Sequence, residues 1–97
     1  MNILNILSND NFITVNKTIA AEVGLEAAVI LGELASEYAY WSTRTNGLED
    51  GSFYSTIENL EKKTFLSGHN QRIVLSVLQE KGWIEVSKKG LPAKRYI

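Results

Sequence analysis

The chain has 97 residues, no cysteine and a formal net charge of −1. This length allows one domain with a modest core, and the lack of cysteine excludes disulfides and thiolate metal ligands. No apolar run approaches the roughly 20 residues needed to cross a bilayer. The N-terminus, "MNILNILSNDN", has neither the basic start nor the small-residue cleavage site of a signal peptide. We therefore expect a cytoplasmic protein with no membrane partner.

The charge is divided unevenly along the chain. Residues 1–61 carry two basic and nine acidic residues, a net charge of −7. Residues 62–97 carry eight basic and two acidic residues, a net charge of +6. Such a split indicates either an anionic partner for the basic part, such as nucleic acid, or simply two solvated halves.

The first third of the chain predicts an arm followed by helices. Residues 1–11 are expected to form an arm, and the alternating segment "NFITVN" (11–16) a strand or an extended arm. Asn16 can cap a short helix over 17–23, which Gly24 ends.

Residues 25–44 form the most apolar segment and predict a central, buried helix. The aromatic residues near its end are Tyr38, Tyr40 and Trp41. We interpret this aromatic group as core plus a packing edge, with an aromatic binding box as the alternative. The apolar residues that recur at helical spacing are Ala27, Ile30, Leu31, Leu34, Tyr38 and Trp41.

A loop over 45–52 separates this helix from a second group of elements. The letters "FYS" (53–55) predict a very short strand. Ser55 followed by Glu58 has the spacing of a capping box, in which a hydroxyl and a carboxylate each bond a backbone N–H at a helix start. A short helix over 55–63 is expected to follow.

Ser67 predicts the N-cap of a longer helix over 67–81. Val74, Leu75 and Leu78 are its expected core residues, and Gly82 is expected to end it in a left-handed conformation.

Two strand-like runs, 83–89 and 93–97, predict a basic hairpin around the only proline. From residue 53 onward the order is therefore strand, short helix, tight corner, longer helix and hairpin. This order predicts a single α+β, mainly helical domain of the winged helix-turn-helix type. In that motif the second helix lies in the major groove of DNA, with its first turns against the bases.

The expected DNA contacts come from the corner, the second helix and the hairpin. Arg72 can donate two hydrogen bonds to a guanine edge, Asn70 can pair with adenine, and His69 can touch a base or a phosphate. Small residues at the corner let a duplex approach, and the lysines suit phosphates. The full set is Lys62, Lys63, Ser67, Gly68, His69, Asn70, Arg72, Ser76, Lys88, Lys89, Lys94 and Arg95.

The same residue types also occur at these places in proteins that bind no DNA. His69 can be a solvated surface residue, lysines at 62–63 favour the end of any helix, and hairpin lysines can protect an edge strand. Ile73 and Val77 put apolar surface near the outward face. A protein-interaction module that dimerises through "MNILNIL" or the long helix is therefore the second hypothesis.

No catalytic residue, metal site or cofactor is expected. The chain has one histidine, no glycine-rich phosphate loop after a strand and no His-x-x-x-His spacing. Glu33 and Glu37 are four residues apart on the long helix and predict a solvated stripe rather than an acid–base pair.

Three segments of the sequence carry a resemblance to a known family: "GLEAAVILGEL", "FYSTIENLEKKT" and "GLPAKRYI". Through them, residues 12–97 resemble the N-terminal winged-helix domain of replication initiator or replisome-organiser proteins of Gram-positive phages, plasmids and mobile elements. The resemblance implies binding of double-stranded origin DNA, a homodimer, and cooperation with a helicase or its loader. A transcriptional regulator is the alternative, because a fold does not fix the process it serves. The sequence stops within its last predicted strand, so we expect a further C-terminal region to be absent.

Overall fold

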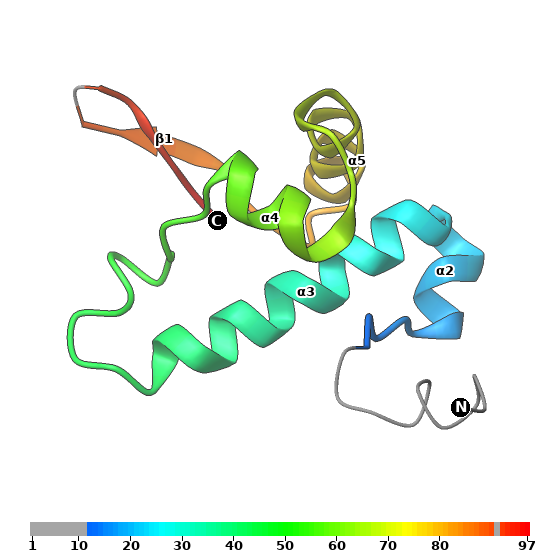
Figure 1. Ribbon diagram of the computed structural model, residues 1–97, viewed down its shortest axis with the longest axis horizontal. Coiled ribbons are helices and arrows are strands. Elements are labelled where there is room, and N and C mark those ends of the chain that lie inside the picture. The colour runs from blue at the N-terminus through cyan, green and yellow to red at the C-terminus, as the bar shows by residue number, and fades with distance from the viewer. Residues whose placement is uncertain (1–11, 91) are drawn as a thin grey trace, which may run out of the picture.

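The computed structural model describes residues 12–90 and 92–97 and shows a small, mainly helical α+β fold (Figure 1). The helices of this part are α2 (Lys17–Val23), α3 (Leu25–Ser42), α4 (Ile57–Thr64) and α5 (Gly68–Glu80). The strands are β1 (Ser87–Lys89) and β2 (Lys94–Tyr96), which form an antiparallel hairpin. The predicted order of these elements is confirmed, whereas the predicted arm over 1–11 lies outside the described residues.

The segment before α2 crosses the long helix instead of joining a sheet. Residues 12–16 form no strand. The carbonyl oxygen of Thr14 lies 2.5 Å from the point where a Cβ on Gly32 would be. Because a side chain at position 32 would meet this backbone, glycine is what lets the segment cross α3 so closely. Asn16 then caps α2 as predicted, accepting the Ile19 N–H at 3.1 Å.

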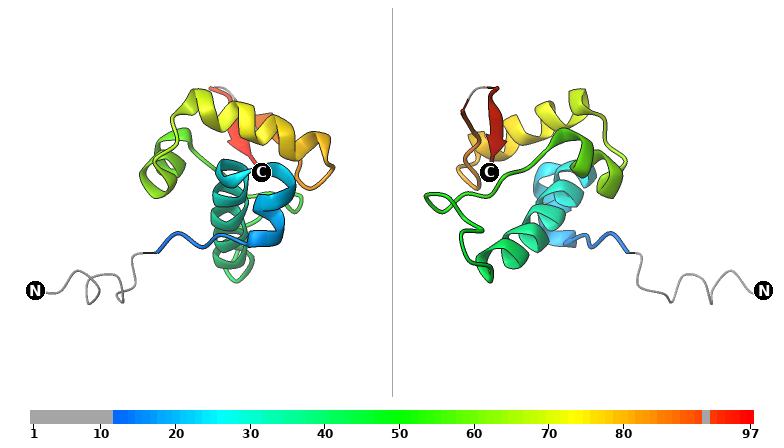
Figure 2. Two further views of the ribbon diagram at one scale, coloured as in Figure 1. Left: turned by 90° about the vertical axis from the view of Figure 1, so that its right-hand side faces the viewer. Right: turned by 60° about the vertical axis from the view of Figure 1, so that its left-hand side comes forward.

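The long helix α3 is the central element, and α5 lies across it (Figure 2). The buried apolar residues of α3 are Ala27, Ala28, Ile30 and Leu34. Leu31 and Trp41 are half-buried, but Tyr38 is 49% exposed, so the core face is narrower than the predicted one. Tyr40 is also exposed, and its ring lies under the Arg44 guanidinium at 3.9 Å. Of the aromatic group only Trp41 reaches the core.

The start of α4 differs from the predicted capping box by one residue. Thr56, not Ser55, is the N-cap, and its hydroxyl accepts the Asn59 N–H at 3.0 Å. Ser55 is buried, and its backbone N–H donates to the Arg95 carbonyl at 2.9 Å. Strand pairing therefore holds Ser55 in an extended segment, and the helix begins only after it.

The predicted start, core face and end of α5 are confirmed. Ser67 caps the helix by accepting the Asn70 N–H at 3.2 Å. Val74, Leu75 and Leu78 are buried against α3 and α4, and Gly82 follows the helix with φ of 74°. The core also includes Ala27, Ile30, Leu34, Phe53 and Leu60.

The hairpin is shorter than predicted, since residues 83–86 form no strand. β1 and β2 pair Lys88 with Arg95 and Lys89 with Lys94. Residues 53–55 lie along the other edge of β2, but they form an isolated bridge there and not the predicted very short strand. Phe53 and Ile97 exchange backbone hydrogen bonds of 3.0 Å in both directions, and Tyr54 is bridged to Tyr96. The sheet itself has two strands, and β2 is bridged to this extended segment on its other side.

Candidate nucleic-acid interface

One face of α5 is turned to solvent and carries most of the predicted base-contacting residues. His69, Arg72 and Ser76 are exposed, whereas Gly68 and Asn70 are half-buried. These residues follow the capped start of the helix, where backbone N–H groups have no intrahelical partner. The exposed face of α5 therefore carries these polar residues together with the exposed Ile73.

The corner before α5 is tight because Gly68 packs on α4. A Cβ on Gly68 would lie 3.0 Å from Cγ2 of Ile57. The small residue at 68, predicted to let a duplex approach, thus also has a structural role inside the fold. The Ser67 hydroxyl is likewise occupied by the Asn70 N–H of the helix cap.

A groove of about 310 Å³ separates α5 from the hairpin. Arg72, Ser76 and Gln79 line its α5 side, and Lys88 lines its hairpin side. Arg72 and Lys88 are 16 positions apart in the printed sequence, yet the fold brings both to one groove. This is the place where a predicted base contact and a predicted phosphate contact come together.

The four basic residues of the hairpin do not form one surface. In a strand, side chains alternate between the two faces, and residues paired across strands share a face. Lys88 and Arg95 are one pair and line the groove beside α5, whereas Lys89 and Lys94 are the next pair on the opposite face. The predicted set is therefore split between two sides of the sheet.

Arg95 is turned inward and ties the hairpin to the helices. Its Nε donates to the Ser55 carbonyl at 3.1 Å, its Nη2 donates to the Ser55 hydroxyl at 3.3 Å, and both Nη atoms donate to Oε1 of Gln71 at 3.2 Å. Burial lowers the pKa of the Arg95 guanidinium, while the charges of Glu37 and Glu58 raise it. Most of the donor capacity of Arg95 is thus used inside the protein.

Gln71 is fully buried and connects four parts of the chain. Its Nε2 donates to the Ile57 carbonyl at 3.0 Å and to the Leu66 carbonyl at 2.9 Å, and its Oε1 accepts from Arg95. Sequence analysis missed this residue, although the helical spacing of the core face of α5 includes position 71. A polar residue on a buried stripe is the signal that identifies such a junction.

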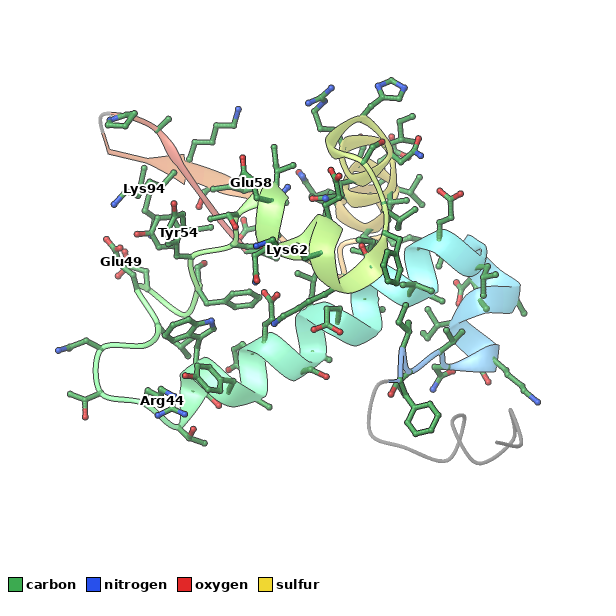
Figure 3. All side chains as sticks on the ribbon, in the orientation of Figure 1. Arg44, Glu49, Tyr54, Glu58, Lys62 and Lys94 are labelled. Atoms are coloured by element: carbon green, nitrogen blue, oxygen red, sulfur yellow. The ribbon has the colours of Figure 1, made fainter. Side chains whose placement is uncertain are left out.

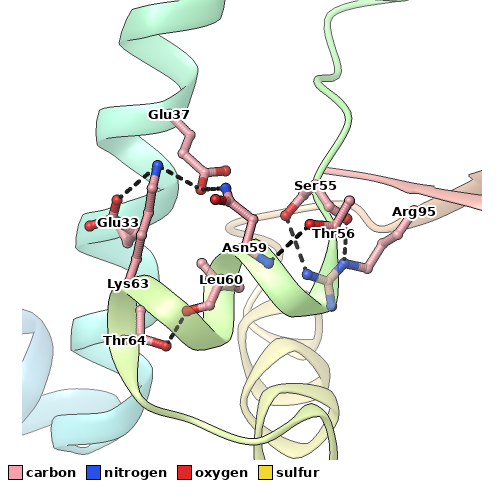
Figure 4. A network of polar contacts seen from close by, with 9 residues as sticks. All are labelled: Glu33, Glu37, Ser55, Thr56, Asn59, Leu60, Lys63, Thr64 and Arg95. Carbon is pink, nitrogen blue, oxygen red and sulfur yellow. Dashed lines mark hydrogen bonds and ion pairs between the residues drawn. The ribbon is translucent and has the colours of Figure 1, made fainter.

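Lys62 and Lys63 point to different sides of α4. Lys63 lies 3.6 Å from a Glu33 carboxylate oxygen and 3.5 Å from one of Glu37 (Figure 4). Lys62 is exposed and lies beside Glu58 on the other side of the helix, where Phe65 is also exposed (Figure 3). Of this lysine pair, only Lys62 is turned away from the acidic residues of α3.

The predicted solvated stripe on α3 is wrong for Glu37. Glu37 is 5% exposed and accepts from Nδ2 of Asn59 at 3.3 Å, in addition to its ion pair with Lys63. Burial raises the pKa of the Glu37 carboxyl above its ordinary value, and Lys63 opposes this only in part. The helical spacing placed Glu37 correctly on α3 but did not show that α4 covers it.

Glu37→Gln is expected to stabilise the protein at pH 7, by about 1 kcal/mol or less. A raised pKa in the folded state means that the stabilising contribution of Glu37 is present below the unfolded pKa and is lost as pH rises through the folded pKa. Glutamine keeps the oxygen that accepts from Asn59 but carries no charge to desolvate. Urea unfolding followed by tryptophan fluorescence at pH 7 and at about pH 3.5 measures the difference, which should vanish at the lower pH.

The matched control is Glu33→Gln, which removes the more exposed partner of the same lysine and should bring no gain. A Glu37→Gln variant that is less stable than the parent at pH 7 would show that the ion pair with Lys63 outweighs the burial of the carboxyl.

Comparison of the chain with protein-family models, with curated proteins and with solved structures found no significant match. Among residues 12–90 and 92–97, no group of three His, Asp or Glu side chains is placed to hold a metal ion. No helix in this part of the chain is both long and apolar enough to span a membrane.

Proposed function

We propose that residues 53–97 form a winged helix-turn-helix that binds double-stranded DNA. In this proposal α5 is the recognition helix and lies in the major groove, and the β1–β2 hairpin is the wing. The observation that carries the proposal is the groove between these elements, to which Arg72 and Lys88 both contribute. An arginine suits a guanine edge, and a lysine suits the phosphate backbone beside it.

The process that such binding serves follows from the resemblance noted in the sequence. We propose initiation of DNA replication in a phage or other mobile element, in the cytoplasm, with the chain acting as a homodimer that cooperates with a helicase or its loader. Transcriptional regulation is the alternative with the same DNA contacts.

A labelled duplex from the neighbourhood of the protein's own gene, titrated at two salt concentrations, tests the proposal by fluorescence anisotropy. We expect tighter binding to this duplex than to a scrambled one. We also expect affinity to fall with salt by a slope of about −2 to −4 in log–log form, as two to four phosphate contacts give. Affinity that is weak and independent of salt would contradict the proposal.

A protein-binding module is the second candidate, because apolar residues lie among the polar ones. Ile73 is 53% exposed on α5, one residue from Arg72, and Phe65 is 82% exposed at the corner. Exposed apolar side chains can be contact points for another protein, although single ones also occur on ordinary surfaces. This candidate predicts no duplex binding at low salt, and it predicts dimers in sedimentation that Ile73→Ser weakens.

A further inference from the structure

The outer face of the hairpin carries two tyrosines and two lysines side by side. Tyr54 is joined to Tyr96 of β2 by an isolated bridge, and their ring centroids are 5.8 Å apart with a tilt of 35°. Lys94 lies 5.4 Å from the Tyr54 ring centroid, and Lys89 lies 4.9 Å from that of Tyr96. Figure 3 shows Tyr54 and Lys94 together on this side of the sheet. We call these four residues the tyrosine–lysine face.

The tyrosine–lysine face lies away from the groove of the proposed duplex site. Side chains alternate along β2, so Arg95 points to Gln71 and Ser55, while Lys94 and Tyr96 point to the opposite side. Neither tyrosine lines the groove of Arg72 and Lys88. At the edge of the sheet, however, Tyr54 and Lys94 share a second hollow with Lys88.

The arrangement of this face costs the sheet some stability, and packing of the core does not require that arrangement. Lys89 and Lys94 are direct cross-strand neighbours, and like charges at such positions destabilise a sheet. Tyr54 is 46% exposed, so only about half of its surface is buried. Cation–π contacts offset part of the repulsion. A ligand that brings both negative charge and flat rings would satisfy the lysines and the tyrosines together.

We propose that the tyrosine–lysine face binds single-stranded DNA. Unpaired bases can stack on exposed aromatic rings, while the adjoining phosphates lie against lysines. In a duplex the faces of the bases are already stacked on one another, so the duplex cannot use the tyrosines in this way. The proposal does not depend on the duplex site, because it involves other residues on another face.

Two carboxylates of the loop before residue 53 compete for this face. Asp50 lies 3.7 Å from Nζ of Lys89, although Asp50 itself is 91% exposed. Glu49 lies near Tyr54 (Figure 3). Since both carboxylates repel phosphate, replacing them by their amides should strengthen single-strand binding, a gain that a merely structural role would not give.

The experiment is an anisotropy titration of fluorescein-labelled (dT)20, with the gene-proximal duplex titrated in parallel. We expect the parent chain to bind (dT)20, and Tyr54→Ala to lose about tenfold in affinity, within the range of one lost base stack. Glu49→Gln combined with Asp50→Asn should tighten binding. Tyr38→Ala is the matched control, since Tyr38 on α3 is similarly exposed, at 49%, and it should leave (dT)20 binding unchanged.

The two titrations separate the two proposals. Loss of (dT)20 affinity in folded Tyr54→Ala, with duplex binding retained, supports the tyrosine–lysine face. Duplex binding by the parent without (dT)20 binding, or equal (dT)20 affinity in Tyr54→Ala and Tyr38→Ala, would overturn it and leave the duplex proposal standing. Binding of (dT)20 without duplex binding would overturn the duplex proposal instead. Circular dichroism of each variant checks that it is folded.

Discussion

Arg95→Ala is expected to reduce the free energy of unfolding by about 2–3 kcal/mol, because it leaves buried polar atoms without partners. The Oε1 of Gln71 loses the donors of Arg95, and the carbonyl and hydroxyl of Ser55 lose theirs. Gln71 is 0% and Ser55 2% exposed while the guanidinium covers them. Urea unfolding followed by the fluorescence of Trp41 and Trp83 measures the loss.

Lys94→Ala is the control for this prediction, since Lys94 is the exposed neighbour of Arg95 on the same strand. It should change stability by no more than about 0.5 kcal/mol, as is usual for surface positions. The double variant Gln71→Met with Arg95→Met should cost less than the sum of its single changes, because it removes both sides of the contact. Equal stability of Arg95→Ala and Lys94→Ala would show that the guanidinium bonds contribute nothing to the fold.

Arg72→Ala is expected to reduce the preference for the cognate duplex over a scrambled one by about 1–3 kcal/mol, the value of one bidentate base contact. Arg72 is exposed on α5 and lines the groove beside the hairpin, so its loss should leave the fold intact. Competition titrations with the two duplexes measure the ratio of affinities. An unchanged ratio would mean that Arg72 does not read bases.

Lys88 and Lys89 provide a matched pair for the phosphate contact, because they are adjacent and chemically identical but lie on opposite faces. Lys88→Ala should weaken binding to both duplexes to a similar extent and lower the salt slope by about one. Lys89→Ala should have the smaller effect, since its Nζ lies over the Tyr96 ring and near Asp50. The opposite result would place the duplex on the tyrosine–lysine face.

The helical part of the fold was predictable because its signals are local. Asn16 and Ser67 are N-caps as their types and positions indicate, and Val74, Leu75 and Leu78 are buried as their spacing requires. A cap and an apolar stripe each act within a few residues, so the sequence alone determines them. The same stripe contains Gln71, whose burial could have been inferred from its register on α5.

The errors arose where a distant segment competes for a residue. Ser55 has the local pattern of an N-cap, but its pairing with β2 keeps it out of the helix. Glu37 has the spacing of a solvated stripe, but Asn59 and Lys63 of α4 cover it. Neither partner is visible in a short window of sequence, because tertiary contacts override local preference.

The division of the hairpin lysines was hidden for a different reason. Alternation along a strand predicts that neighbours such as Lys94 and Arg95 point to opposite faces. Which face is inward depends on the register, since a slip of one residue exchanges the two sets. Here the register of β2 is shared with β1 and with residues 53–55, and only the assembled sheet shows that Arg95 is the inward residue.

The pairing of residues 53–55 with β2 also bears on the order in which the chain folds. Ser55 and Arg95, which it brings together, are 40 residues apart, with α4 and α5 between them. Closing so long a loop costs entropy before any contact is gained, whereas the corner of α4 and α5 needs only near neighbours. We therefore expect the corner to form early and the pairing of residues 53–55 with β2 to be a late step. Contacts formed after the transition state mainly slow unfolding, so this small sheet would set the lifetime of the folded state more than the speed of its formation.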